Sequence, residues 1–125
     1  MNKKITTLQA PAAIGPYSQA IEADSYIFVS GQLPIDPTTG QFVGDDISKL
    51  TRQSLTNIRN ILSEAGLTMA NVVKTTVMLT DMNDFPAMNE VYAEFFSEPF
   101  PARSAFAVKA LPKGGKVEIE CIAKK

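Results

Sequence analysis

Two segments of the chain repeat apolar or small residues every three or four positions, which is the period of an amphipathic helix. The first segment shows this repeat at Ile47, Leu50, Ser54, Ile58, Ile61, Leu62 and Ala65. Asp45 and Asp46 precede it as candidate N-caps, and Gly66 follows as a candidate C-cap. The second segment starts after Asp84, another candidate N-cap, and its apolar face comprises Phe85, Met88, Val91, Tyr92, Phe95 and Phe96. The pattern therefore predicts two helices.

Five further segments are rich in β-branched and aromatic residues, or alternate between two kinds of side chain, as β-strands do. They cover residues 17–23, 26–29, 72–79, 102–108 and 117–123. Turn-forming prolines and glycines mark loops at 34–40 and 112–115. This order of strands and helices predicts an α+β fold in which both helices pack on one face of a single sheet.

The strand Tyr26–Val29 is apolar on both of its sides. Two helices on one face of a sheet cover only one of these sides. In so short a chain, the most economical cover for the other side is a second copy of the same molecule. We therefore predict a homo-oligomer.

Length and composition describe one globular domain, residues 1–125, with a small-molecule partner. The 125 residues are 45% hydrophobic, enough for a core. Twelve basic and thirteen acidic residues give a net charge of −1, which argues against nucleic acid or an anionic membrane as the main partner. No segment approaches the ~20 apolar residues that span a bilayer or resembles a secretion signal, so we expect a cytoplasmic protein.

The residue types that are missing exclude several kinds of active site. The chain has no histidine, so a Ser-His-Asp triad, a Cys-His pair and a histidine-ligated zinc site are all ruled out. Its one cysteine, Cys121, forms no intrachain disulfide and lies on the apolar side of its strand, which favours a buried position over a nucleophilic role. We expect no metal. Any acid or base must be Glu, Asp, Lys, Tyr or this cysteine.

Two strands carry candidate chemistry. Arg103 shares a strand side with Ala105 and Ala107, whose small side chains leave room for a carboxylate bound bidentately by the guanidinium. Glu118 and Glu120 lie together on the polar side of the last strand, where one could act as a general base. Each pattern has a plainer interpretation: a solvent-facing arginine, and acids on a half-exposed strand.

Weaker candidates lie at strand ends and on the second helix. Ser30 and Gly31 are ordinary turn formers on their own. Tyr17 could bind a ligand through its hydroxyl or fill an interface with its ring. Asn89 is either a solvent-facing helix residue or a substrate contact.

Together these segments closely resemble the Rid family of reactive intermediate deaminases, also called the YjgF family. The resemblance covers nearly the whole chain in order, through Ile14-Gly15-Pro16-Tyr17-Ser18-Gln19-Ala20, Val29-Ser30-Gly31-Gln32, Asn57, Lys74-Thr75-Thr76-Val77, Pro101-Ala102-Arg103-Ser104, Leu111-Pro112 and Val117-Glu118-Ile119-Glu120.

The resemblance implies a chorismate-mutase-like fold, a six-stranded mixed sheet, and a homotrimer built around a barrel-like core with active sites between subunits. It implies hydrolysis of 2-imino acids, chiefly 2-iminobutanoate and 2-iminopropanoate, to 2-oxo acids and ammonia without cofactor or metal. Pyridoxal phosphate enzymes such as threonine dehydratase release these imines.

By position in the family, Arg103 would bind the substrate carboxylate and Glu118 would activate water. Tyr17, Ser30, Gly31 and Asn89 would line the cleft. This chain has Ala105 where many members have a cysteine, which leaves any role of that thiol in doubt here. Two other functions stay open: a non-catalytic module that binds 2-oxo or amino acids, and a ribonuclease or translation inhibitor, against which the near-neutral charge and the missing histidine argue.

Overall fold

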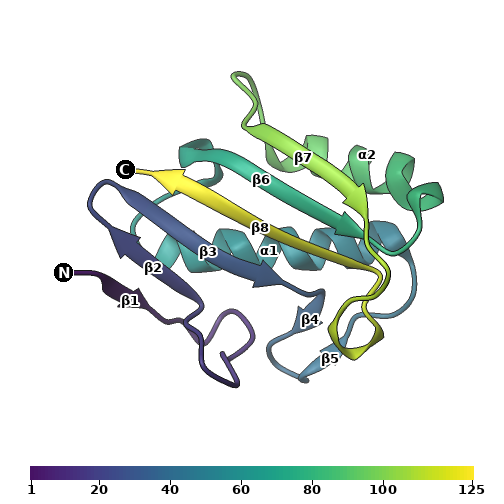
Figure 1. Ribbon diagram of the computed structural model, residues 1–125, viewed down its shortest axis with the longest axis horizontal. Helices are drawn as coiled ribbons and strands as arrows, with labels where there is room; N and C mark the ends of the chain where they lie inside the picture. Colours follow the sequence, from purple (N-terminus) through teal and green to yellow (C-terminus); the bar gives the residue numbers. More distant parts are fainter.

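A six-stranded mixed sheet with two helices on one of its faces makes up most of the molecule (Figure 1), in a computed structural model that describes residues 1–125. The strand order is β1-β2-β3-β8-β6-β7, in which only β6 and β7 are parallel. The strands are β1 (Lys3–Ile5), β2 (Ala20–Ala23), β3 (Tyr26–Gln32), β4 (Ile35–Asp36), β5 (Gln41–Phe42), β6 (Val72–Leu79), β7 (Ala102–Ala107) and β8 (Val117–Lys124). The helices are α1 (Ile47–Glu64), α2 (Phe85–Phe95) and the 3₁₀ turns η1 (Met69–Asn71), η2 (Met82–Asp84) and η3 (Pro112–Gly114).

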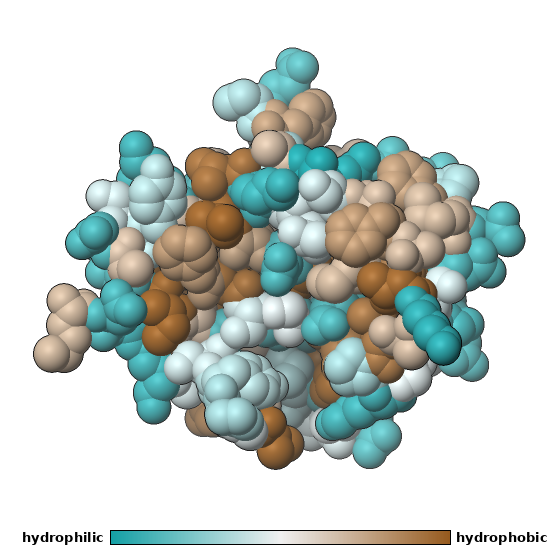
Figure 2. Space-filling view, in the orientation of Figure 1, coloured by the Kyte–Doolittle hydropathy of each residue, from teal (hydrophilic) through white to brown (hydrophobic).

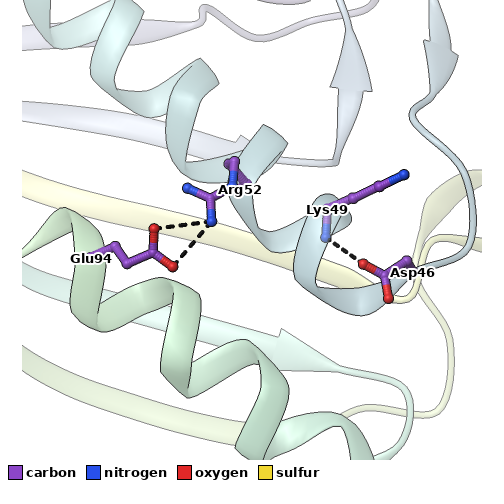
Figure 3. Close-up of polar contacts among 4 residues, drawn as sticks. All are labelled: Asp46, Lys49, Arg52 and Glu94. Carbon is purple, nitrogen blue, oxygen red and sulfur yellow. Dashed lines mark hydrogen bonds and ion pairs between the residues drawn. The ribbon is translucent and has the colours of Figure 1, made fainter.

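Both predicted helices are confirmed, but one predicted cap is wrong. The Asp46 carboxylate accepts a hydrogen bond from the backbone N–H of Lys49 at the start of α1 (Figure 3), and Gly66 follows the helix with a φ of +77°. Asp84 makes no side-chain cap at the start of α2. The preceding turn η2 runs directly into α2, and Asp81 caps this turn instead by accepting from the backbone N–H of Asn83.

The strands match their expected positions with four differences of more than one residue. β3 was expected to end at Val29 but continues to Gln32. β2 begins at Ala20, so residues 17–19 are not part of it. β1 was not predicted as a segment, because three residues are too few to show alternation. The loop at 34–40 contains the strand β4. This strand pairs with β5, just after the loop, to form a separate two-stranded sheet.

The hydrophobic core lies between the sheet and the two helices. α1 contributes Leu55, Ile58 and Ile61, all with no exposed surface, and the sheet contributes residues such as Val77 and Ile119. Burying a side chain of this size contributes roughly 1.5–3 kcal/mol relative to leaving it in water. Burial alternates along β6 and β8, so each of these two strands has one side in this core and one side away from it.

The opposite face of the sheet carries no helix or strand of this chain, and it is the face seen in Figure 1. Tyr26, Phe28 and Phe106 project from it, with 40%, 46% and 45% of their surface exposed. Figure 2 shows apolar patches on this face separated by hydrophilic residues. The uncovered apolar face predicted from Tyr26–Val29 is thus present, whereas the oligomer that would cover it stays a prediction.

Two buried polar side chains fix the loops that border β3. The Gln19 amide accepts from the N–H of Thr7 and donates to the carbonyls of Thr7 and Pro11, which ties residues 7–11 to β2. Asn57, fully buried in α1, donates to the carbonyls of Leu33 and Ile35 just after β3.

No helix of the chain is both long and apolar enough to cross a membrane.

We expect Asn57→Ala to lower the free energy of unfolding by about 2–4 kcal/mol, because the carbonyls of Leu33 and Ile35 lose their donor and a small cavity forms. Asn60→Ala is the matched control. It removes a single exposed hydrogen bond, from Asn60 to the carbonyl of Gln9, and should cost under about 1 kcal/mol. Urea unfolding at equal protein concentrations measures both. Equal losses in the two variants would contradict the assigned role of Asn57.

Candidate functional site

Glu118 lies directly over Gly31, where β3 departs from regular pairing with β8. Val29 is opposite Cys121 and Gln32 is opposite Ile119, so three steps along β3 match two along β8, and Ser30 and Gly31 form a β-bulge. A Cβ atom on Gly31 would be 2.5 Å from the Glu118 Oε2 atom. The carboxylate therefore occupies the space that any other residue at position 31 would fill. We call Glu118, Gly31 and Ser30 the acid half of the site.

The environment of Glu118 makes it a stronger base than an ordinary glutamate. Partial burial raises the pKa of its carboxyl above the usual value, and the negative charge of Glu120 raises the pKa further. Both side chains project from the same, uncovered side of β8, as their alternation with the buried Val117, Ile119 and Cys121 predicts. A carboxylate of this kind accepts a proton more readily near neutral pH.

The segment that carries Tyr17 runs beside the acid half. Ser30 donates from its backbone N–H to the Gln19 carbonyl at 2.9 Å and from its hydroxyl to the Ser18 carbonyl at 2.6 Å. Because its hydroxyl proton is engaged in this way, Ser30 holds the 17–19 segment against β3. Tyr17 itself is 53% exposed, so its ring and hydroxyl are available at the surface.

Arg103 lies on β7, on the side of the sheet that faces α2. Its guanidinium Nη1 donates to Asn89 Oδ1 at 2.7 Å. Its Cζ atom is 4.7 Å from the ring centroid of Tyr92 and 5.4 Å from that of Phe85. We call Arg103 and Asn89 the arginine half of the site.

The expected neighbours of Arg103 are present, together with contacts from α2 that were not expected. Arg103, Ala105 and Ala107 do share one side of β7, because they pair with the buried Thr75, Val77 and Leu79 of β6. Arg103 and Ala107 are exposed, and the rings of Phe85 and Tyr92 on α2 contact the guanidinium itself. Arg103 is therefore an exposed residue whose guanidinium is held by Asn89 and two aromatic rings.

Within one chain, the two halves lie on opposite faces of the sheet. Arg103 pairs with Thr75, which pairs with Cys121, and these residues face the helices. Glu118 pairs with Met78 on the other face. The two residues are also two strands apart and three residues out of register, which adds roughly 10 Å in each direction. One small molecule cannot contact both side chains of the same chain.

Other polar features lie away from both halves. A hollow of about 460 Å³ between α1 and α2 is lined by Arg52, Arg59, Glu94 and Phe95, among others, and contains none of the candidate residues. Arg52 and Glu94 form an ion pair of 3.0 Å beside it (Figure 3). No group of three or more His, Cys, Asp or Glu side chains is placed to hold a metal ion.

Cys121 is buried as predicted, with 3% of its surface exposed. Burial raises the pKa of its thiol to about 12, with a smaller contribution from the charge of Glu120. The thiol therefore stays protonated at neutral pH and is a poor nucleophile.

The contacts of Arg103 with Phe85 and Tyr92 were not predicted from the sequence, although the sequence contains a signal for them. Phe85, Asn89 and Tyr92 are spaced i, i+4 and i+7, so they form one stripe along α2. The helical pattern assigned both aromatic residues to the core. Tyr92 is buried in the core as predicted and Phe85 is partly buried against it, and both rings also contact the arginine.

Three comparisons with known proteins each match nearly the whole chain. The family model described as Endoribonuclease L-PSP matches residues 7–125. A 2-iminobutanoate/2-iminopropanoate deaminase of Bos taurus is 54% identical over 123 residues, which is 98% of this chain and 90% of that protein.

Solved structures also match nearly the whole chain. A protein of the conserved Rid family from Yersinia pestis superposes with a TM-score of 0.97 at 49% identity, over the whole of both chains. E. coli TdcF with bound serine superposes with a TM-score of 0.93 at 45% identity, over 98% of each chain.

Gly31→Ala tests the position of Glu118. The new Cβ would overlap the carboxylate, so we expect Glu118 to turn toward solvent and the pKa of its carboxyl to fall toward the ordinary value. Titration of the glutamate carboxyl carbons by ¹³C NMR measures this change. Thermal unfolding of the variant checks that the fold is retained. An unchanged titration midpoint for Glu118 would show that its carboxylate does not rest on Gly31.

Proposed function

The chain belongs to the Endoribonuclease L-PSP family, also known as the YjgF/Rid family, and we propose that it hydrolyses 2-imino acids to 2-oxo acids and ammonia. The proposed substrates are 2-iminobutanoate and 2-iminopropanoate, named in the activity of the Bos taurus relative. The proposal rests on the arrangement of two groups. The guanidinium of Arg103, bound to Asn89, lies on one face of the sheet, and the Glu118 carboxylate, whose pKa is raised, lies on the other.

These two groups match the two ends of the substrate. A guanidinium binds a carboxylate through two parallel hydrogen bonds and keeps its charge, so Arg103 is suited to the substrate carboxylate. Glu118 is suited to act beside the C2 carbon of the substrate, where it would orient a water molecule and take a proton from it. Serine bound to the related TdcF also carries a carboxylate next to a carbon–nitrogen bond, which supports a substrate of this shape.

The proposal requires self-association, because one molecule of substrate cannot reach Arg103 and Glu118 of the same chain. We propose a homotrimer in which the arginine half of one protomer meets the acid half of its partner. Tyr17, Ser30 and Gly31 would line the cleft beside Glu118, and Asn89 would line it beside Arg103. The exposed Tyr26, Phe28 and Phe106 would be buried in the same assembly.

The proposed reaction needs only orientation and one base. The water oxygen bonds to C2 of the protonated imine, the π electrons of the C=N bond move to nitrogen, and Glu118 takes a proton from the water. Glu118 then protonates the amine nitrogen. As the C–N bond breaks, the hydroxyl proton returns to Glu118 and passes to the released ammonia, which leaves as ammonium. Such proton transfer contributes about 10²- to 10⁴-fold in rate.

The proposal assigns no cofactor or metal to the reaction. It places the protein in the cytoplasm beside pyridoxal phosphate enzymes such as threonine dehydratase, which release 2-imino acids.

A module that binds 2-oxo or amino acids without turnover is the second candidate, and the serine-bound relative is the observation in its favour. The catalytic assay described next separates the two, because a binding module would leave the rate of imine hydrolysis unchanged.

We expect this protein to accelerate the hydrolysis of imine released when threonine dehydratase acts on threonine. With semicarbazide present as a trap, trapped imine should fall and 2-oxobutanoate should form faster. Arg103→Ala should reduce kcat/KM by about 10- to 100-fold, since it removes a charge-assisted bidentate contact. Arg103→Lys should recover only part of the loss, because lysine keeps the charge without the fork.

Arg59→Ala is the matched control for Arg103→Ala. Arg59 is also exposed and also stacks on an aromatic ring, that of Phe95, at 5.4 Å. Its loss should leave the activity unchanged. All variants should retain a mass of about three times 13.5 kDa by light scattering. A trapping yield that the wild-type protein does not alter would favour the binding module.

The pH dependence should identify the base. Activity requires ionised Glu118, so kcat/KM should fall as the pH drops through its pKa, at a pH above that of an ordinary glutamate. Glu120→Gln removes a negative charge that raises this pKa, so the acid limb should move to lower pH while activity persists. Glu118→Gln should instead lose about 10²-fold or more at every pH. If Glu120→Gln is the inactive variant, the roles of the two acids are reversed.

A further inference from the structure

One stripe of α2 surrounds the Arg103 side chain. Phe85, Asn89 and Tyr92 are spaced i, i+4 and i+7, so they lie above one another on the helix side that faces β7. All three contact the guanidinium: two through their rings and one through its amide oxygen. Cation–π contacts within about 6 Å of a ring centroid are attractive, and both rings meet that distance.

The stripe is itself fixed to the strand next to β7. The Tyr92 hydroxyl shares a hydrogen bond of 2.7 Å with Thr75 Oγ1, and both residues are buried. Thr75 is also the residue of β6 that pairs with Arg103. Backbone pairing from β6 and ring contact from α2 therefore meet at the same point, so the guanidinium has a defined position before any ligand arrives.

The contact with Asn89 limits how the guanidinium can bind a ligand. Arginine has five N–H donors, and one hydrogen of Nη1 is directed at Asn89 Oδ1. Contact with the two rings shields part of the guanidinium face. A carboxylate must then approach along a remaining N–H edge, and the orientation of that edge depends on Asn89 and the rings.

We propose that Phe85, Asn89 and Tyr92 form an arginine cradle, and that Asn89 serves ligand recognition by holding Arg103 and not by contacting the ligand. This inference rests on the proposed function for the identity of the ligand, a small 2-oxo or 2-imino monocarboxylate. Asn89 and Tyr92 are in this sense positioning residues. Misplacing a binding group by as little as 1 Å can cost about 100-fold in an enzyme, so such a cradle has a measurable effect.

A double-mutant cycle separates holding from direct contact. The probe is 2-oxobutanoate, titrated into the full-length protein and followed by NMR chemical shifts. Asn89→Ala should weaken binding about tenfold in the wild-type background, the loss of one hydrogen bond to a charged group. In the Arg103→Ala background, the same change should have no further effect. An equal loss in both backgrounds, or none in either, would overturn the proposal.

A second measurement does not depend on binding or catalysis. Rotation about the Arg103 Cζ–Nε bond, observed through the ¹⁵N-labelled guanidinium, should be slow in the wild-type protein and about tenfold faster or more in Asn89→Ala, where the hydrogen bond is lost. Unchanged rotation in Asn89→Ala would also overturn the proposal.

Two tyrosine variants distinguish the ring from the hydroxyl. Tyr92→Leu removes the ring and should speed the rotation and raise KM for the imine more than it lowers kcat. Tyr92→Phe keeps the ring and loses only the hydrogen bond to Thr75, so it should change both quantities in the same direction but by less than Tyr92→Leu. If Tyr92→Leu does not fold, Phe85→Leu tests the second ring in its place. A wild-type protein that does not hydrolyse imines would refute the proposed function, whereas the rotation data would still decide whether the cradle exists.

Discussion

The alternation of side chains along β7 and β8 separates the two groups that the proposed chemistry needs. Arg103 faces the helices and Glu118 faces away from them, and no rotation of either side chain reverses the side of a strand from which it starts. The same alternation leaves Tyr26, Phe28 and Phe106 on the uncovered face. A reaction that uses both groups therefore depends on a second copy of the chain, and the apolar face provides a surface on which that copy could bind.

Most of the fold could be predicted because its periodic signals are local. The α1 repeat gave both ends of the helix, since Asp46 and Gly66 are residues whose chemistry suits those ends. The alternation of β8 correctly separated Glu118 and Glu120 from Cys121. Local patterns failed where length or context decides: β1 is three residues long, and Asp84 is not a cap because a preceding turn already leads into α2.

The candidate site was less accessible because its geometry depends on contacts between distant segments. Nothing near Gly31 in the sequence indicates that the Glu118 carboxylate lies against it, since this follows from a bulge in the pairing of β3 with β8. The alanines share the strand side of Arg103 as predicted, but the strand pattern gave no sign of its contacts with Phe85 and Tyr92 of α2. Residue types identified which groups could react, whereas tertiary packing determined what surrounds each of them.

The charges of the two halves favour an imino acid over RNA, despite the description of the family as an endoribonuclease. A protonated 2-imino acid is a zwitterion, positive at the C=N group and negative at the carboxylate. Glu118 and Glu120 would attract its positive end, and Arg103 would bind its negative end.

An RNA phosphate would instead be repelled by the paired acids, and the net charge of −1 offers no basic track for the strand. RNA cleavage also usually uses a general acid and a general base together, and this chain lacks histidine, the residue that most often fills either role. Partial burial raises the pKa of Glu118 and the charge of Glu120 raises it further, so the acid that helps to attract a cationic imine also strengthens the base that acts on it.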